Sequence, residues 1–258
     1  MTKNDLRNLV LDLISSQKED TFYDFKQEWH KNNANLIKDI ICLANCNHNG
    51  NRYLIIGVNE EDYSIIDIKE DANRKTQANI IDLLRSSSFA GGNSPSILLE
   101  TIEINNKHID IIIIENKQEK PYYLTETYSN NKKYVYAGAI YTRNKDTNTP
   151  NNQTASTLDV ENMWKERFGL TLSIRDKFKL YLQDYENWRN SIVFYEIEDN
   201  KYDKFYYEKF PEFQIHNLYE DSINRTYTGW LSCLKAFSKI YHPYKQHVKE
   251  GSFAYVWF

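Results

Sequence analysis

Few side chains in this sequence stand at a spacing that by itself defines a chemistry. Cys42, Cys46 and His48 are of the types that bind zinc, but no fourth ligand follows at a suitable spacing. Cys42 and Cys46 are one helical turn apart in a segment that needs apolar side chains, so we interpret both as core residues. Gly91-Gly92 has no lysine after it at phosphate-loop spacing, which argues against a Walker-type ATP site.

Basic and aromatic side chains near the expected strands are candidates for contacts with polyphosphate and unpaired bases. Tyrosines in strands are more often packing residues, but an exposed ring can stack on a base. The tyrosine candidates are Tyr122, Tyr123, Tyr136 and Tyr141. The candidates for phosphate contacts are Lys26, Arg52, Lys132, Lys133, Arg143 and Lys145.

The overall charge limits what kind of nucleic-acid binding is expected. The chain has 32 basic and 36 acidic residues and a net charge of −4. A protein that coats duplex DNA without sequence preference is normally basic, because phosphate contacts supply the affinity. Any nucleic-acid binding by this chain must therefore depend on a local patch.

The sequence also favours a cytoplasmic protein without a membrane span. It contains no apolar run of the ~20 residues that a bilayer-spanning helix requires, and its start lacks the basic-then-apolar layout of a secretory signal. Its 3 cysteines are an odd number in a long chain, which does not suggest a disulfide framework.

The elements that must position these candidates alternate between helices and strands in the first 150 residues. Apolar spacing predicts helices around residues 6–14, 32–44 and 74–87. Alternating or continuous apolar runs predict strands at 21–29, 52–58, 64–68, 97–104, 108–115 and 134–141. We expect the 64–68 strand to form a hairpin with 52–58. The fold class is therefore α+β, with a mixed sheet and flanking helices.

The Asn-, Thr- and Pro-rich stretch at 143–156 predicts a boundary between a domain at 1–150 and one at 151–258. Ser156 with Asp159, and Ser173 with Asp176, have the spacing that caps helix starts. Alternating aromatic residues after Ser191 then predict several strands, so the second domain is also α+β. The apolar ending Phe253–Phe258 favours a chain cut within a strand.

An ordered set of short motifs gives the first part of the chain a family resemblance. The motifs are Glu19, Asp24-Phe25-Lys26, Ala44-Asn45, Leu54-Ile55-Ile56-Gly57-Val58 with Glu60, and Gly138-Ala139-Ile140-Tyr141-Thr142-Arg143. Their order over roughly residues 15–145 resembles the AlbA_2 (Schlafen-type) domain, formerly described as a divergent ATPase-like module in bacteria. Two departures are a single glycine in Gly50-Asn51-Arg52 and Asp24 in place of the usual glutamate.

The resemblance implies a set of catalytic carboxylates. Some Schlafen proteins cleave RNA with three carboxylates, and the matching positions here are Glu19, Asp24 and Glu60. In a catalytic member these residues would hold Mg²⁺ or Mn²⁺, which polarises a phosphate oxygen and lowers the pKa of bound water. A binding module of the same family would need no cofactor.

Three classes of function follow from these observations. The first, which we favour, is a DNA- or RNA-binding module, since bacterial relatives include transcriptional regulators and defence proteins. The second is a metal-dependent endoribonuclease that uses Glu19, Asp24 and Glu60. The third is a protein-interaction module without nucleic-acid binding, which the acidic net charge keeps open. The sequence leaves formation of a homo-oligomer open.

Overall fold

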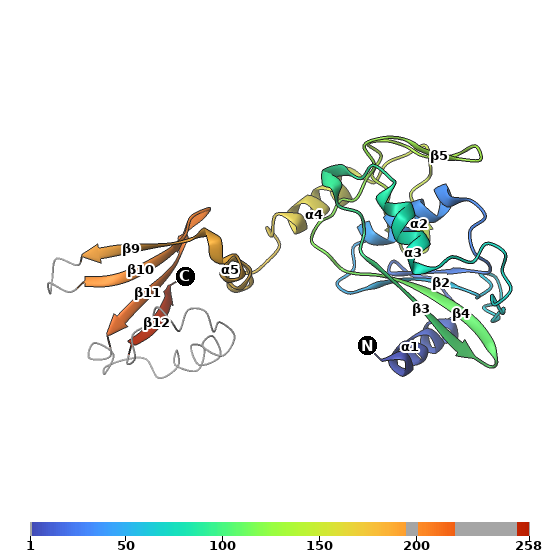
Figure 1. The fold of residues 1–258 in the computed structure, drawn as a ribbon, viewed down its shortest axis with the longest axis horizontal. Helices are drawn as coiled ribbons and strands as arrows, with labels where there is room; N and C mark the ends of the chain where they lie inside the picture. The colour runs from blue at the N-terminus through green and yellow to red at the C-terminus, as the bar shows by residue number, and fades with distance from the viewer. Residues whose placement is uncertain (1, 195–200, 220–251, 258) are drawn as a thin grey trace. The chain divides into compact units, whose positions relative to one another are not determined.

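A four-stranded mixed sheet forms the centre of the first part of the chain in the computed structural model (Figure 1). The structure describes residues 2–194, 201–219 and 252–257. The strand order is β1-β2-β4-β3, in which β1 pairs parallel with β2 and the other neighbours are antiparallel. The strands are β1 (Tyr23–Lys26), β2 (Arg52–Ile56), β3 (Ile97–Ile104) and β4 (Lys107–Ile114).

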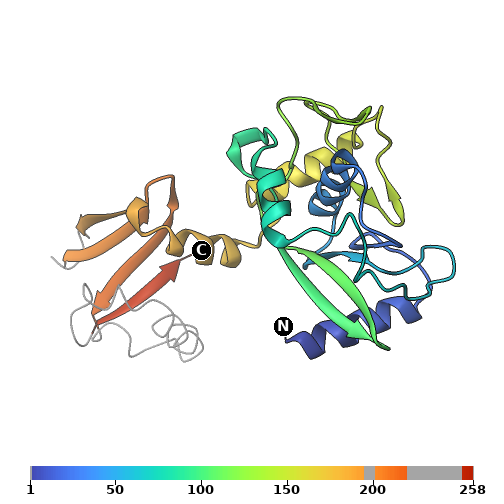
Figure 2. The ribbon, with the colours of Figure 1, turned by 45° about the vertical axis from the view of Figure 1, so that its right-hand side comes forward.

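Helices cover both faces of this sheet. Helix α1 (Lys3–Ser15) lies on one face, and α2 (Asn33–Asn45) and α3 (Gln77–Arg85) lie on the other (Figures 1 and 2). Side chains alternate along β2, so that Tyr53 and Ile55 join the core under α1. The residues between and beside them, Leu54 and Ile56, join the core under α2 and α3. This arrangement confirms the predicted α+β class with a mixed sheet and flanking helices.

Local sequence signals set the starts of these helices. Side chains of Thr2, Asn32 and Thr76 each accept a hydrogen bond from a backbone N–H in the first turn of α1, α2 and α3, respectively. Such caps satisfy amides that have no partner inside the helix. The Asn32 cap agrees with the start predicted for the second helix.

The hairpin of β3 and β4 is also set locally. Asn105 and Asn106 connect the two strands with φ angles of 51° and 59°. Two consecutive residues with positive φ form the tight turn whose twist matches paired strands, and asparagine tolerates this conformation well. The predicted hairpin is therefore confirmed.

Three predicted strands differ from those observed. The segment 64–68 forms no strand, and a single bridge joins Val58 to Ile65. The 21–29 strand is confined to β1, because the bends after Lys26 lead into α2. Of 134–141, only the first residues are extended; they belong to a short hairpin of β5 (Tyr128–Asn130) and β6 (Lys133–Val135).

The remaining elements of this part are short. A 3-10 turn, η1, spans Ala90–Gly92. The loop before α4 contains a small hairpin of β7 (Arg143–Asn144) and β8 (Thr147–Asn148). Helix α4 (Thr157–Arg167) begins at its Ser156 cap, as the sequence predicted. Gly169, with a φ of 65°, follows the end of α4.

The chain divides into two compact units, Met1–Thr171 and Leu172–Phe258. The second unit contains α5 (Ile174–Gln183), capped by Ser173 as predicted. A 3-10 turn, η2 (Tyr185–Asn187), and an antiparallel sheet of order β12-β11-β10-β9 follow. Its strands are β9 (Trp188–Phe194), β10 (Lys201–Tyr207), β11 (Phe210–Tyr219) and β12 (Ser252–Trp257). The predicted boundary at 150 falls before α4, whereas the compact units separate after it.

Two further expectations concern burial and membranes. Cys42 and Cys46 are free and buried in the core, as interpreted from their spacing, and Cys233 lies outside the described residues. Within the described residues, no helix has both the length and the apolar character needed to cross a bilayer.

Candidate functional site

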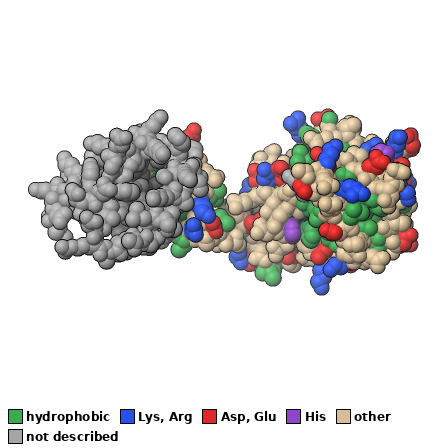
Figure 3. All heavy atoms as spheres, turned by 90° about the horizontal axis from the view of Figure 1, so that it is seen from below, with side chains coloured by type: hydrophobic (Ala, Val, Ile, Leu, Met, Phe, Trp, Pro, Cys, Tyr) green, Lys and Arg blue, Asp and Glu red, His purple; other side chains and the backbone are tan. Residues whose placement is uncertain are grey.

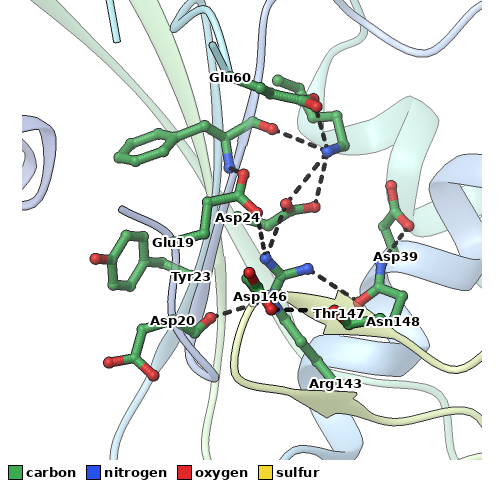
Figure 4. A network of polar contacts seen from close by, with 12 residues as sticks. Glu19, Asp20, Tyr23, Asp24, Asp39, Glu60, Arg143, Asp146, Thr147 and Asn148 are labelled. Atoms are coloured by element: carbon green, nitrogen blue, oxygen red, sulfur yellow. Dashed lines mark hydrogen bonds and ion pairs between the residues drawn. The ribbon is translucent and has the colours of Figure 1, made fainter. Parts of the chain in front are cut away.

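The three carboxylates singled out in the sequence lie close together beside β1 (Figure 4). Glu19 and Asp24 both contact Arg143, at 2.6 and 3.2 Å from its Nη2 atom. Lys26 Nζ lies 3.1 Å from Asp24 Oδ2 and 2.8 Å from Glu60 Oε1. Two basic side chains therefore connect the three carboxylates into one network, which we call the Arg143 network.

The pairing of β1 with β2 explains why Glu60 reaches this network. Lys26 lies opposite Ile56 in the parallel register, so both strands end at the same edge. Gly57 then turns the chain with a φ of 108°. A Cβ atom at this position would lie 2.9 Å from the carbonyl oxygen of Ile66, so the turn requires glycine. Glu60 follows in the loop after this turn.

Arg143 is buried and all of its contacts are within the protein. Its side chain is 2% exposed and makes a salt bridge with Glu19. Its Nε donates to the carbonyl oxygen of Asp20 at 3.0 Å, and its Nη1 donates to Asn148 Oδ1 at 3.1 Å. This guanidinium joins loop 143–148 to the start of β1, so its burial gives no support to the predicted phosphate contact by Arg143.

Lys26 is also committed to protein partners. Besides Asp24 and Glu60, its Nζ donates to the carbonyl oxygen of Phe25 at 2.9 Å, and the side chain is only 23% exposed. Burial lowers the pKa of Lys26, but the charges of Asp24 and Asp39 and the contact with Glu60 raise it more, so the net shift is upward. Lys26 has no ammonium donor left for a phosphate in this arrangement.

The carboxylates of the Arg143 network do not fit a divalent cation as they are arranged. Glu19 accepts one hydrogen bond from the Phe25 amide, at 3.0 Å, and another from Arg143. Side-chain cations occupy the space between the acids, and no group of three or more His, Cys, Asp or Glu residues in the described chain is placed to hold a metal ion. The metal-dependent ribonuclease stays a prediction of the resemblance that this geometry does not support.

Asp24 titrates far from the usual range of an aspartate. Burial raises its pKa from 3.8 to about 8, against the opposing effects of Lys26 and Arg143. Between these two values the folded state binds a proton that the unfolded state has released. This group therefore contributes stability below about pH 4, and that contribution is lost as the pH rises through about 8.

Substitution of Asp24 by asparagine tests this titration. We expect the free energy of unfolding of the wild type, minus that of Asp24→Asn, to fall by on the order of 4 kcal/mol between about pH 5 and about pH 8. Urea denaturation of both proteins at intermediate pH values measures the difference, and the subtraction removes the titration of all other groups. A difference that stays constant with pH would show that Asp24 has an ordinary pKa.

Among the other predicted basic residues, Arg52 is buried and three lysines are exposed. Arg52 is 0% exposed, and its Nη2 donates to the carbonyl oxygens of Cys46 and His48. Arg52 thus holds the loop between α2 and β2, and its burial gives no support to the predicted phosphate contact. The exposed residues are Lys132, Lys133 and Lys145, whose ammonium groups have no ion pair or hydrogen bond to any described residue.

Lys132 and Lys133 belong to a hairpin that also presents two aromatic rings. Tyr134 and Tyr136 are 41% and 44% exposed, and their rings stack at 5.9 Å between centroids with an interplanar angle of 15°. Val135, between them, is 1% exposed and packs into the core. The alternation along an extended segment therefore places both rings on the solvent side. We call Lys132, Lys133, Tyr134 and Tyr136 the hairpin patch.

The sequence identified this patch only in part. Tyr136 and both lysines were candidates, whereas Tyr134 was not, although its position two residues before Tyr136 was a signal for a shared face. Of the other tyrosine candidates, Tyr122 and Tyr141 are 3% and 0% exposed and are therefore packing residues. Tyr123 is half-buried. On the face shown in Figure 3, lysine and arginine side chains are interspersed with aspartate and glutamate.

Comparisons with solved structures give two distant likenesses. The crystal structure of the DIP2311 protein from Corynebacterium diphtheriae is 17% identical, with a TM-score of 0.33, and the match covers 57% of this chain and 26% of that one. This chain thus spans about a quarter of its length. The solution structure of the N-terminal domain of a RecG-related protein from Nitrosomonas europaea is 16% identical, with a TM-score of 0.31, covering 57% of this chain and 95% of that one.

No curated protein matches the sequence. Comparison with protein families, by contrast, assigns the first part of the chain to a family. The family model described as Schlafen, AlbA_2 matches residues 19–152, a segment that begins at Glu19 and contains the Arg143 network and the hairpin patch. The match covers more than half of the chain and confirms the resemblance found in the ordered motifs. The chain therefore belongs to the Schlafen AlbA_2 family.

Proposed function

We propose that this protein binds single-stranded nucleic acid through the hairpin patch. Membership of the Schlafen AlbA_2 family supports a role connected with nucleic acid. The observation that carries the proposal is the stacked, exposed pair Tyr134 and Tyr136 directly after two lysines that have no partner among the described residues. Aromatic rings offer stacking faces to unpaired bases of any sequence, and neighbouring lysines neutralise backbone phosphates.

The patch also agrees with the charge of the molecule. A net charge of −4 disfavours binding through a broad basic surface, whereas stacking depends little on net charge. The rigid support of the hairpin favours binding as well. Asn130, at the end of β5, accepts a hydrogen bond from the Asn32 side chain at 2.7 Å, so the hairpin is fixed to the start of α2. Rings held in place lose little conformational entropy when a base stacks on them.

Alanine substitution of both rings tests the stacking. Stacking contributes about 1–3 kcal/mol per base, so Tyr134→Ala with Tyr136→Ala should weaken binding by about 30-fold or more when each ring stacks on one base. Fluorescence anisotropy with labelled single-stranded RNA and DNA measures the affinity and compares the two strand types. Phe168→Ala, which removes another exposed ring of the same unit, is the matched control and should bind as the wild type does.

Alanine substitution of both lysines tests the phosphate contacts. For a single strand, each phosphate contact contributes a slope of about 0.7 to the salt dependence, so Lys132→Ala with Lys133→Ala should reduce the slope of log Kd against log salt by about 1.4. Lys69→Ala, an exposed lysine without a side-chain partner in the described chain, is the control. Retention of the wild-type slope and affinity in the tyrosine and lysine variants would favour a protein-interaction module instead.

A further inference from the structure

A polar cavity without acidic residues in its wall lies apart from the Arg143 network. Its volume is about 320 Å³, and it is bounded by the start of α2, the loop before α3 and the first two turns of α3. The polar lining residues are Asn33, Asn73, Arg74, Lys75 and Asn79, with Ala72 and Leu83 as apolar contacts. In a chain with an excess of acids, a cavity lined by two cations and three amides selects for an anionic ligand.

One of the two cations is available to such a ligand. Arg74 is bound to Asp110, with Nε–Oδ2 and Nη2–Oδ1 distances of 2.8 and 2.9 Å, so its charge is balanced inside the protein. Lys75 is half-buried, and its ammonium group has no partner among the residues that the structure describes. The cavity therefore presents one uncompensated positive charge on a flexible stem, which suits a phosphate group.

The amides supply the complementary polar groups. The backbone N–H groups of Asn33 and Asn73 donate to Asn130 Oδ1 and Asp71 Oδ1, respectively. The side-chain amides of both asparagines make no hydrogen bond within the described residues. Asn79 uses its Oδ1 to accept from Thr76, which leaves its Nδ2 available as a donor. An asparagine amide offers one donor and one acceptor side by side, which matches the N6 and N7 edge of adenine.

We infer that this cavity binds an adenine nucleotide, with the phosphate at Lys75 and the base against the asparagine amides and Leu83. The volume lies at the lower end of the range for small-molecule sites and exceeds the needs of an inorganic phosphate. Two helix starts line it, at Asn33 of α2 and Asn79 of α3, and neither helix has an acidic residue in its first turn. Both helix starts are capped, by Asn32 and by Thr76, so Lys75 supplies the positive charge of the site.

The nucleotide can be free or can be one unit of a strand. The Asn33 backbone N–H donates to Asn130 Oδ1 at 3.3 Å, so the wall of the cavity touches the end of β5, close to the hairpin patch. A nucleic-acid strand bound by the hairpin patch can therefore place one of its nucleotides in the cavity. Binding of a strand in this way rests on the proposed function, whereas binding of a free nucleotide does not depend on it.

Calorimetric titration of the full chain with AMP, adenosine and inorganic phosphate tests the inference. AMP should bind at least about tenfold more tightly than either adenosine or phosphate alone, because only AMP uses both halves of the site. Lys75→Gln should weaken AMP binding by about tenfold or more. Ala72→Trp, at an exposed position of the wall, should block the cavity without disturbing the core. Lys69→Gln is the matched control and should bind AMP normally.

The outcomes separate this inference from the proposed function. Absence of AMP binding, AMP binding no tighter than that of phosphate, or wild-type affinity in both Lys75→Gln and Ala72→Trp overturns it. Tyr134→Ala with Tyr136→Ala should leave the affinity for AMP unchanged. The experiment can therefore contradict strand binding by the hairpin patch without contradicting AMP binding in the cavity, and the reverse. Displacement of AMP by a 5′-phosphorylated single-stranded oligonucleotide identifies a strand as the source, and lack of displacement identifies a free nucleotide.

Discussion

Replacement of Arg143 by alanine is expected to lower the free energy of unfolding at about pH 8 by about 3–5 kcal/mol, because it leaves the carboxylates of Glu19 and Asp24 without their guanidinium partner. Arg143 contacts Glu19 at 2.6 Å and Asp24 at 3.2 Å, and the Asp24 side chain is only 2% exposed. The substitution also leaves the Asp20 carbonyl without the donor that Arg143 Nε supplies. Urea denaturation of the full chain, monitored on a probe in the first unit, measures the loss.

Two comparisons make this prediction specific. Lys145→Ala removes an exposed cation two residues away and should change stability by less than about 0.5 kcal/mol. Arg143→Lys keeps the charge but cannot reproduce the planar fork of donors, so it should fall between the wild type and alanine. Equal stability of Arg143→Ala and Lys145→Ala would contradict the structural role of the Arg143 network.

The loss caused by Arg143→Ala should also depend on pH. Burial raises the pKa of Asp24 to about 8, so in acid solution this carboxyl is neutral and needs no cation. We therefore expect a smaller destabilisation at about pH 5 than at about pH 8. Arg143 is thus used for internal neutralisation, which disfavours both a phosphate contact by its guanidinium and a metal ion at the carboxylates.

Replacement of Asn45 by alanine is the second substitution with a large expected effect, a loss of about 3 kcal/mol in the free energy of unfolding. Asn45 is 1% exposed at the end of α2. Its Nδ2 donates to the carbonyl oxygens of Tyr122 and Tyr141, both at 2.8 Å, and its Oδ1 accepts from the Tyr122 N–H at 2.7 Å. Alanine would leave three buried backbone groups unpaired.

The control for this substitution lies two residues further on. Asn47 is exposed and its side chain makes no hydrogen bond within the described chain, so Asn47→Ala should leave the urea midpoint nearly unchanged. Asn45→Asp keeps the acceptor but removes both donors, and it should be at least as destabilising as alanine because it also buries a charge. If Asn45→Ala unfolds at the same urea concentration as Asn47→Ala, the Asn45 amide does not hold the segments around Tyr122 and Tyr141 to the end of α2.

Asn45 also gives a physical reason for one motif of the family resemblance. The Ala44-Asn45 step was one of the ordered features in the sequence, without an evident role. In the structure it connects the end of α2 to the segments around Tyr122 and Tyr141, which are 77 and 96 residues away in the chain. The motif is therefore connected with the fold and not with the chemistry of a site.

The sequence by itself determined the elements whose signals are local. Helix caps at Asn32, Ser156 and Ser173, the turn at Asn105-Asn106 and the burial of Cys42 were all predicted correctly. The caps and the turn depend on residues within about one helical turn or one tight turn, where a side chain satisfies a neighbouring backbone group or fits a required φ angle. The burial of Cys42 was predicted from the apolar spacing of the helix that carries it. The order of motifs also identified the family.

Only the tertiary structure decided which charged residues are available. Arg52 and Arg143 could not be told from Lys132 and Lys145 in the sequence, because burial depends on segments far away in the chain, such as Glu19 for Arg143. The predicted strand at 64–68 likewise does not form, and only a single bridge joins Val58 to Ile65. Local sequence sets the conformations that each segment prefers, whereas solvent exposure and charge pairing are properties of segments brought together by the core, and these decide which side chains remain free to bind a ligand.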